Sequence, residues 1–198
     1  MTIFLLVVVS YLLGSIPFSY IVPKLTSKID IRSVGSGNTG TTNVVRTLGL
    51  KIGVIAFLGD FLKGLIPALI GISLLGHMGG LIGGGVAVLG HCYSVWLSFK
   101  GGKGIATSAG VIVALFPIIA VILVIWQFFI IFATKFMSLA SITSAVLFPV
   151  LVIAFGFETK TIIFSIALGA FVIYRHRSNL QRLLKGEEKK LTIAKKAK

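Results

Sequence analysis

Long runs of apolar residues alternate with short polar stretches along the chain. A transmembrane helix needs about 20 mostly apolar residues. The pattern predicts membrane-spanning helices over 2–23, 52–75, 79–97, 136–157 and 161–174, the last of them short. A further uncharged run, 105–134, contains Pro117 and is either two short crossings or one long tilted helix. The predicted fold class is therefore an all-α, polytopic membrane helical bundle.

Composition supports this class, because 56% of the 198 residues are hydrophobic, more than a soluble domain of this length could bury. No charged side chain precedes Lys24, whereas a secretory signal peptide carries basic residues before its apolar core. We therefore expect the first apolar run to be a retained span. The single cysteine, Cys92, excludes an intramolecular disulfide and a cysteine metal cluster. No other group of metal ligands has a suitable spacing, and neither a metal nor a cofactor is expected. The chain is expected to form one domain, 1–198, with a basic tail over 186–198.

Basic residues predict the orientation in the membrane, because Lys and Arg concentrate on the cytoplasmic side. The formal net charge is +14, and the stretch 24–51 and the C-terminal tail are both basic. Three spans then place Lys100 and Lys103 in the cytoplasm and the N-terminus outside. A cytoplasmic C-terminus requires an even number of further crossings, so a division at Pro117, giving about seven spans, is preferred. An undivided helix would require a re-entrant segment. Because the basic residues flank spans, we expect contact with the lipid bilayer and no nucleic-acid binding.

The first polar stretch, "VGSGNTGTTNVVRTLG" over 34–49, has the residue types of an anion site. Glycines allow positive φ and close backbone approach to a ligand, and a short helix opening at "TTNVVR" would favour an anion at its N-terminus. Arg46 can fork onto phosphate oxygens. Uncharged polar donors come from Ser36, Asn38, Thr41, Thr42 and Asn43. The alternative is an ordinary Gly/Ser/Asn loop.

The second polar stretch is "GHCYSVWLSFKGGKGIAT" over 90–107. It is not a nucleotide-binding P-loop, because Gly104 follows Lys103 and Leu97 stands where the first glycine would be. Its glycines, with Lys100 and Lys103, still favour an anion site that leads into a helix N-terminus. The alternative is a basic turn that flanks a span.

The third polar stretch is "YRHRSNLQRLLKGEE" over 174–188. His176, Arg177, Asn179 and Arg182 are close enough in sequence to share one helix end. A basic amphipathic helix on the membrane surface is the alternative. Because all three stretches are predicted to be cytoplasmic, we expect them to form a single composite site.

Other polar residues are weaker candidates. Asp60 and Lys63, spaced i, i+3 within a predicted span, can neutralise each other; they are either functional or a packing ion pair. Ser138 and Ser141 share a helix face, although serines in spans often bond only to their own helix. Cys92 is expected to be buried and structural.

Taken together, "GSGNTGTTNVVRTLG", "GHCYSVWLSFKGGKGIAT" and "HRSNLQRLLKGEE" resemble the three motifs of the bacterial acyl-phosphate-dependent glycerol-3-phosphate acyltransferases, the PlsY family. The resemblance implies a seven-helix protein of the bacterial inner membrane with its motifs facing the cytoplasm. It implies transfer of an acyl group from acyl phosphate to the first hydroxyl of glycerol 3-phosphate, giving lysophosphatidate, as the first step of phospholipid synthesis. A monomer is expected. Thr41 and Ser94 depart from the family pattern, which usually has Ala and Pro there, and this puts substrate choice in doubt.

Both substrates of such a reaction carry a phosphate. Lys100 and Lys103 could hold one, and the other could be held by Arg46, His176, Arg177 and Asn179. The backbone N–H groups of Gly101 and Gly102, or the side chains of Ser36 and Asn38, are candidate oxyanion donors. The glycines of 79–97 let helices approach closely, so that helix should be packed on all sides, and they could also leave room for the acyl chain.

No general base is evident, because Ile82, Trp96 and Gln181 stand five residues after the three histidines, where an H-x-x-x-x-D pair would have its acid. We therefore expect direct transfer without an acyl-enzyme, the hydroxyl proton passing to a substrate phosphate oxygen. His91 and His176 are fallback bases, and Glu188 is expected to orient a neighbouring arginine or the glycerol hydroxyl. The predicted catalytic residues are Ser36, Asn38, Lys103 and His176. The predicted binding residues are Gly37, Thr42, Asn43, Arg46, His91, Lys100, Gly101, Gly102, Gly104, Thr107, Ser141, Arg177, Asn179, Arg182 and Glu188.

The rival class is a transporter of a phosphorylated solute. A transporter should carry ionisable or broken-helix features at mid-membrane, and here only Asp60 and Lys63 lie deep. A basic scaffold that binds anionic lipid would explain the charge but not the glycine spacing.

Overall fold

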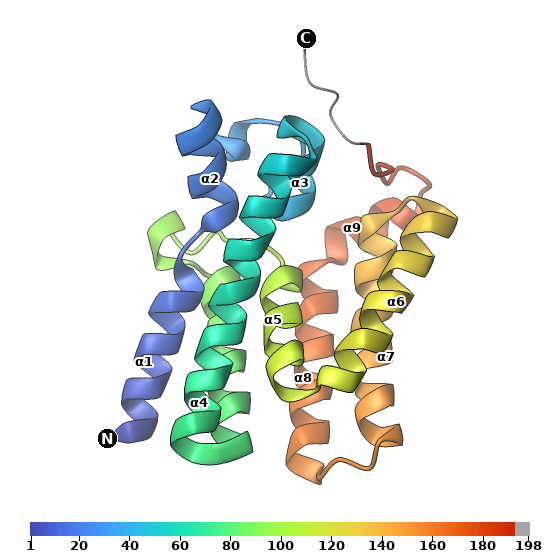
Figure 1. The fold of residues 1–198 in the computed structure, drawn as a ribbon. Coiled ribbons are helices and arrows are strands. Elements are labelled where there is room, and N and C mark those ends of the chain that lie inside the picture. The colour runs from blue at the N-terminus through green and yellow to red at the C-terminus, as the bar shows by residue number, and fades with distance from the viewer. Residues whose placement is uncertain (193–198) are drawn as a thin grey trace. The chain divides into compact units, whose positions relative to one another are not determined.

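The computed structural model describes residues 1–192, and every regular element in that range is a helix (Figure 1). The basic residues Lys195, Lys196 and Lys198 of the predicted tail lie outside the described residues. The helices are α1 (Thr2–Ser15), α2 (Phe18–Ser27), η1 (Ile31–Ser33), α3 (Thr41–Leu48), α4 (Leu50–Cys92), η2 (Val95–Leu97), α5 (Ile105–Leu115), α6 (Pro117–Thr134), α7 (Met137–Ala154), α8 (Thr159–Arg175) and α9 (Arg177–Leu184). The chain divides into two compact units, one reaching to Leu115 and the other spanning Phe116–Leu191.

The predicted first span is two helices, because α1 ends before Pro17 and α2 begins after it. A residue that precedes proline is driven out of the helical region, and Ile16 has an extended ψ of 117°. The last carbonyls of α1 therefore need partners outside the helix. Ser94 Oγ donates to the Ser15 carbonyl at 2.5 Å, and Lys63 Nζ donates to the Ile16 carbonyl at 2.6 Å. This break thus places two polar groups deep in the first unit.

α4 contains both the second and the third predicted spans, because it turns back at Leu75 and Gly76, which have non-helical backbone angles. Gly76 has a φ of 62°, which glycine adopts without strain. Just after this turn, a Cβ on Gly79 would overlap the carbonyl of Gly71, so the two halves of α4 are in direct backbone contact. The second half ends at Cys92, not at residue 97 as the apolar pattern predicted.

The glycine-rich half of α4 is tightly packed inside the first unit, as predicted. A Cβ on Gly90 would overlap the backbone of α1, one on Gly83 would overlap the carbonyl of Pro67, and one on Gly84 would overlap Val111 of α5. Neighbouring helices therefore fill the space that these glycines leave. Gly83, Gly84 and Gly90 therefore leave no room for an acyl chain, and the hypothesis that this glycine-rich helix makes such room gains no support from them.

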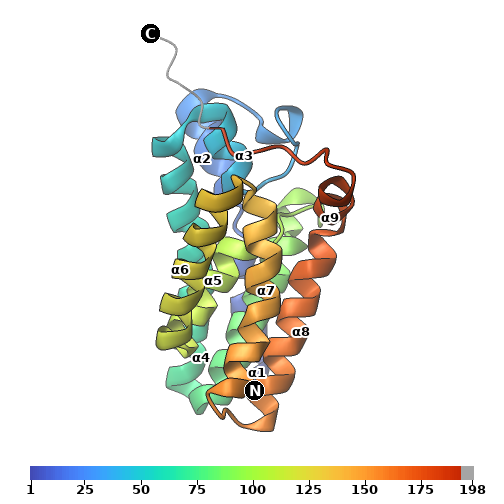
Figure 2. The ribbon, with the colours of Figure 1, turned by 90° about the vertical axis from the view of Figure 1, so that its right-hand side faces the viewer.

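In the second unit, α6, α7 and α8 lie side by side (Figure 2). Polar side chains join α6 to α7: Trp126 donates to Thr143 Oγ1 at 3.0 Å, and Ser144 donates to Gln127 Oε1 at 2.8 Å. A Cβ on Gly169 of α8 would lie against the carbonyl of Ala145 on α7. The predicted break in 105–134 is confirmed, because α5 ends at Leu115 and α6 starts with Pro117, a residue suited to the first turn of a helix.

Four helical segments of the described chain are long and apolar enough to cross a membrane: Thr2–Ser27, Leu50–Leu97, Pro117–Thr134 and Met137–Ala154. Leu50–Leu97 includes both halves of the folded-back α4. Large apolar side chains are widely exposed, and Phe132 on α6 is 80% exposed. Such surfaces suit contact with lipid, since soluble monomers rarely expose large contiguous apolar patches.

Candidate active site

The first motif is a loop shaped from inside by Asn43. This side chain is 2% exposed and lies on α3. Its Nδ2 donates to the carbonyls of Ile31 (3.0 Å), Val34 (3.1 Å) and Asn38 (3.2 Å), and its Oδ1 accepts the N–H of Ser36 at 2.9 Å. The prediction that Asn43 binds phosphate is therefore wrong, because the loop itself uses its amide.

The loop around Asn43 presents Ser36 outward. Gly35 and Gly37 on either side have φ values of 64° and 69°, and a Cβ on Gly35 would overlap the Asn43 amide. Ser36 is exposed, and Asn38 is half-buried. Thr42 and Arg46 are half-buried and lie one turn apart on α3, a spacing that puts them on the same helix face.

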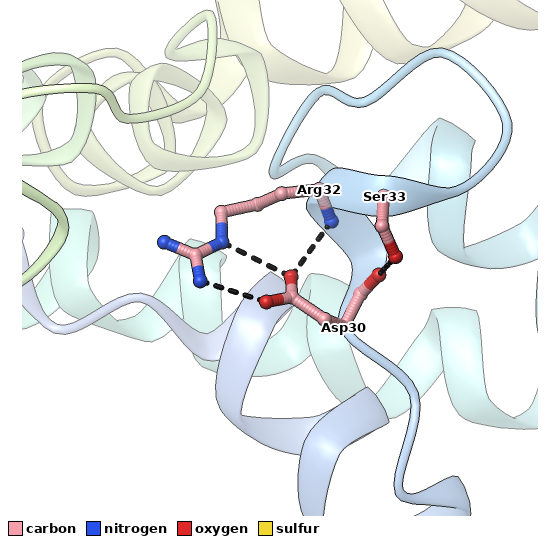
Figure 3. A network of polar contacts seen from close by, with 3 residues as sticks. All are labelled: Asp30, Arg32 and Ser33. Atoms are coloured by element: carbon pink, nitrogen blue, oxygen red, sulfur yellow. Dashed lines mark hydrogen bonds and ion pairs between the residues drawn. The ribbon is translucent and has the colours of Figure 1, made fainter.

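The segment just before the first motif is stabilised by an ion pair between Asp30 and Arg32, which were not among the predicted site residues (Figure 3). Arg32 Nη2 and Nε donate to the two carboxylate oxygens of Asp30 at 2.7 and 3.0 Å, and the backbone N–H of Arg32 donates to Asp30 Oδ1. The hydrogen bonds from Arg32 lower the pKa of Asp30 to about 2. The Arg32 guanidinium also lies over the ring of Tyr20, 4.7 Å from its centre. Arg32 is therefore committed to its own loop.

The second motif folds back on the end of α4. The N–H of Gly101 donates to the Cys92 carbonyl at 3.1 Å, and the N–H of Gly102 donates to the His91 carbonyl at 3.2 Å. A helix C-terminus leaves carbonyls that need such donors. The hypothesis that these two N–H groups stabilise an oxyanion is therefore wrong. Cys92 is fully buried, as expected.

A strained turn brings the lysines of the second motif into place. Ser98 and Phe99 both have positive φ, 51° and 62°, which costs roughly 1–2 kcal/mol for each residue that is not glycine. Lys100 is exposed after this turn, and Lys103 is half-buried. Gly104, with a φ of 91°, leads directly into α5. The predicted helix N-terminus after the glycine turn is thus confirmed.

The first two motifs meet inside the first unit. A Cβ on Gly102 would lie 2.8 Å from the carbonyl of Thr39 and would overlap the imidazole of His91. Hydroxyl oxygens near these two motifs are buried and have no hydrogen-bond partner within the described residues: those of Thr39, Thr41, Thr107 and Ser108. Buried polar atoms normally have a partner. These hydroxyls, like those of Ser10 and Ser15 on α1, therefore have hydrogen-bonding capacity that a polar ligand or a water molecule would meet.

In the second unit, Glu188 organises the third motif. Its Oε1 accepts from Asn179 Nδ2 at 2.8 Å and from Ser138 Oγ at 2.9 Å, and its Oε2 accepts from Arg182 Nε at 2.7 Å. Burial alone would raise the pKa of Glu188, but the hydrogen bonds from Asn179, Ser138 and Arg182 outweigh it and lower the pKa. The expectation that Glu188 orients a neighbouring arginine is confirmed.

His176 is 4% exposed, and its Nδ1 lies 2.8 Å from the Val172 carbonyl. A carbonyl only accepts, so Nδ1 carries the proton and Nε2 is the basic nitrogen of the neutral ring. Arg177 is exposed, donates to the Tyr174 carbonyl and lies over the Tyr174 ring at 4.6 Å. Arg177, Asn179 and Arg182 all lie on α9, with His176 at its N-cap. The prediction that these residues share one helix end therefore holds for His176, Arg177 and Asn179, although the Arg177 guanidinium contacts Tyr174.

Ser138 and Ser141, near the start of α7, differ in their partners. Ser141 donates to the Met137 carbonyl of its own helix at 2.8 Å, whereas Ser138 reaches Glu188. Ser138 and Ser141 lie on one helix face, so sequence spacing alone could not distinguish them.

Residues 4–186 match a family profile described as Glycerol-3-phosphate acyltransferase. A protein of that name from Syntrophomonas wolfei subsp. wolfei is 46% identical over 187 residues, which are 94% of this chain and 96% of that protein. The chain belongs to the glycerol-3-phosphate acyltransferase family. A further member, from Thermoanaerobacter pseudethanolicus, is 47% identical over 184 residues, or 93% of each chain.

Two solved structures of PlsY, described as an integral membrane glycerol 3-phosphate acyltransferase, are also similar. The glycerol 3-phosphate form has a TM-score of 0.92 and 42% identity, covering 97% of this chain and 96% of that one. The lysophosphatidic acid form has a TM-score of 0.90 and 42% identity, covering 96% and 95%. The family resemblance and the all-α membrane fold are thereby confirmed, and the transporter alternative has no support.

Proposed function

We propose that this protein transfers an acyl group from acyl phosphate to the first hydroxyl of glycerol 3-phosphate, giving lysophosphatidate and phosphate. Family membership supports the acceptor and the product, since relatives carry this name and the similar PlsY structures are described as glycerol 3-phosphate and lysophosphatidic acid forms. Phospholipid synthesis follows from the family. The acyl phosphate donor is our own inference, from the resemblance of the three motifs taken together with the residues of the first unit.

The observation that carries this inference is the set of buried hydroxyls without partners at the first two motifs. Phosphate oxygens accept hydrogen bonds from hydroxyls, and cations stabilise their charge. Thr39 and Thr107 would supply such donors, while Lys100, Lys103 and Arg46 supply the charge. An acyl phosphate is already an activated anhydride, so the protein needs chiefly to align the reactants and stabilise the oxyanion.

With the N–H groups of Gly101 and Gly102 engaged, the side chains of Ser36 and Asn38 remain as oxyanion donors. The glycerol oxygen forms a bond to the acyl carbon, and the bond from that carbon to the phosphate oxygen breaks. We propose that the hydroxyl proton passes to a phosphate oxygen and that no acyl-enzyme forms. His176 Nε2 is the fallback base.

In the second unit, His176, Asn179 and Arg182 are the proposed ligands of glycerol 3-phosphate, with Glu188 fixing the last two. Ser141 on α7 and Thr42 on α3 stay proposed as binding residues, and Gly37 and Gly104 stay proposed through their backbone. We further propose that the chain acts as a single monomeric domain in the bacterial inner membrane. About seven crossings, an outside N-terminus and cytoplasmic motifs complete this proposal.

The test uses purified protein with palmitoyl phosphate and glycerol 3-phosphate, following phosphate release and lysophosphatidate by mass. We expect product from acyl phosphate and none from acyl-CoA. Lys103→Ala should lower turnover at least about 100-fold, whereas Lys160→Ala, an exposed lysine at the start of α8, should not. Product from acyl-CoA alone, or equal activity of both variants, would refute the proposed donor site.

A further inference from the structure

A buried ion pair between Asp60 and Lys63 lies near His91, whose ring contacts the glycine turn at Gly102. Lys63 Nζ lies 2.6 Å from Asp60 Oδ1, and their side chains are 3% and 1% exposed. The expectation that the two residues neutralise each other is thus met. A buried ion pair also needs hydrogen bonds for its remaining lone pairs and N–H groups.

This pair in fact ties together several segments of the first unit. Asp60 Oδ2 accepts from Ser19 Oγ on α2 at 2.5 Å. Lys63 Nζ also donates to the Ile16 carbonyl at the break between α1 and α2. On the other side, Asp60 Oδ1 lies 3.7 Å from His91 Nδ1, near the end of α4.

The imidazole of His91 connects this pair to the second motif. Its Nδ1 edge faces Asp60, and its Nε2 edge lies against Gly102, where an added Cβ would overlap it. The His91 carbonyl also accepts the N–H of Gly102. One side chain, 6% exposed, thus separates the buried carboxylate from the loop that leads to Lys103.

We infer that Asp60 and Lys63 are positioning residues that act through His91. The anchored carboxylate fixes the imidazole, the imidazole supports the turn at Gly102, and the turn sets the place of Lys103. The inference deepens the proposed function and rests on it for the role of the loop. Neither Asp60 nor Lys63 touches substrate in this account.

The principal variant is the double substitution Asp60→Asn with Lys63→Met, which removes both charges and leaves no buried charge unpaired. We expect the folded protein to keep its KM for glycerol 3-phosphate while kcat falls about tenfold or more, since small misplacements of a binding group are costly. A role in packing alone would lower the folded fraction and leave kcat per folded molecule unchanged. That outcome would overturn the inference.

A second measurement does not depend on turnover. Hydrogen exchange of the segment 98–104 should be about tenfold faster in the double variant. The N–H groups of Gly101 and Gly102 donate to the carbonyls of Cys92 and His91, and these hydrogen bonds should open more often once His91 is no longer held by Asp60. Exchange in α8 should not change. Unchanged exchange at 98–104 would also overturn the inference, and it would do so even if the parent protein failed to use acyl phosphate.

The path through His91 can be tested by a thermodynamic cycle. His91→Gln should slow turnover, and adding it to the Asp60/Lys63 double variant should cost little more, because the same support is already lost. Additive losses would mean that the pair does not act through His91.

Discussion

Replacing Asn43 with alanine tests whether this residue stabilises the loop of the first motif or contacts the substrate. The Asn43 amide makes its four contacts with the loop while 2% exposed. Removing it leaves the carbonyl of Ile31 without this donor, and Ile31 is fully buried. An unsatisfied buried group costs about 1–3 kcal/mol. Val34 is half-buried and Ser36 is exposed, so water can replace the lost partners of the Val34 carbonyl and the Ser36 N–H. These two groups therefore add less to the loss of stability. We expect a total loss of about 2–4 kcal/mol in the free energy of unfolding.

The single cysteine provides the assay. Cys92 is fully buried and the chain has no other cysteine, so a thiol-reactive dye labels only molecules that have opened. Labelling rates measured against denaturant or temperature then give the stability of Asn43→Ala relative to the parent. Activity is measured on the same samples and divided by the folded fraction.

Asn38→Ala is the matched control, because Asn38 is half-buried in the same loop and is a proposed oxyanion donor. It should keep the stability of the parent within about 0.5 kcal/mol and lose turnover. Asn43→Ala should instead lose stability. If Asn43→Ala were as stable as the parent and lost only activity, the assignment of Asn43 to loop shape would be wrong and a substrate contact would be indicated.

Two further substitutions test the other loops. Gly102→Ala should lower turnover about tenfold or more, because its Cβ would overlap His91 and crowd the Thr39 backbone. Gly156→Ala, where a Cβ meets nothing within 4 Å, should leave turnover unchanged despite its φ of 72°, and equal losses in both variants would refute the steric argument. Glu188→Gln should cost about 1–2 kcal/mol, since one amide oxygen cannot replace two carboxylate oxygens facing Asn179 and Arg182. The lowered pKa of Glu188 means that this stabilisation is present above its ordinary pKa of 4.5 and is lost as pH falls through the lowered value. Dye labelling should therefore show a smaller loss of stability on acidification in Glu188→Gln than in the parent, and identical pH profiles would contradict this assignment.

The sequence was a good guide wherever one residue type decides the local backbone. Pro117 starts a helix, Gly104 precedes another, and the glycines of α4 lie against neighbouring helices, as their chemistry requires. The same reasoning failed at Pro17, which interrupts a span that looked continuous by hydropathy. Hydropathy averages over a window, so it does not register a break whose freed carbonyls are satisfied by Lys63 and Ser94 from distant parts of the chain.

Within the motifs, the sequence identified polar residues but not the direction of their hydrogen bonds. Asn43 and Ser36 are both polar and lie in the same loop, yet one amide is buried against backbone while the other side chain is exposed. Gly101 and Gly102 were expected to donate to a ligand, but the carbonyls at the end of α4 take both N–H groups. The sequence of a motif determines which polar groups lie close together. Each buried backbone group also needs a hydrogen-bond partner. Some polar side chains therefore bond to the loop backbone, and the others stay available to a substrate. In our proposal, Ser36, Asn38 and Lys103 are the groups that meet the substrates, and Asn43, Gly102 and His91 form the frame that holds them.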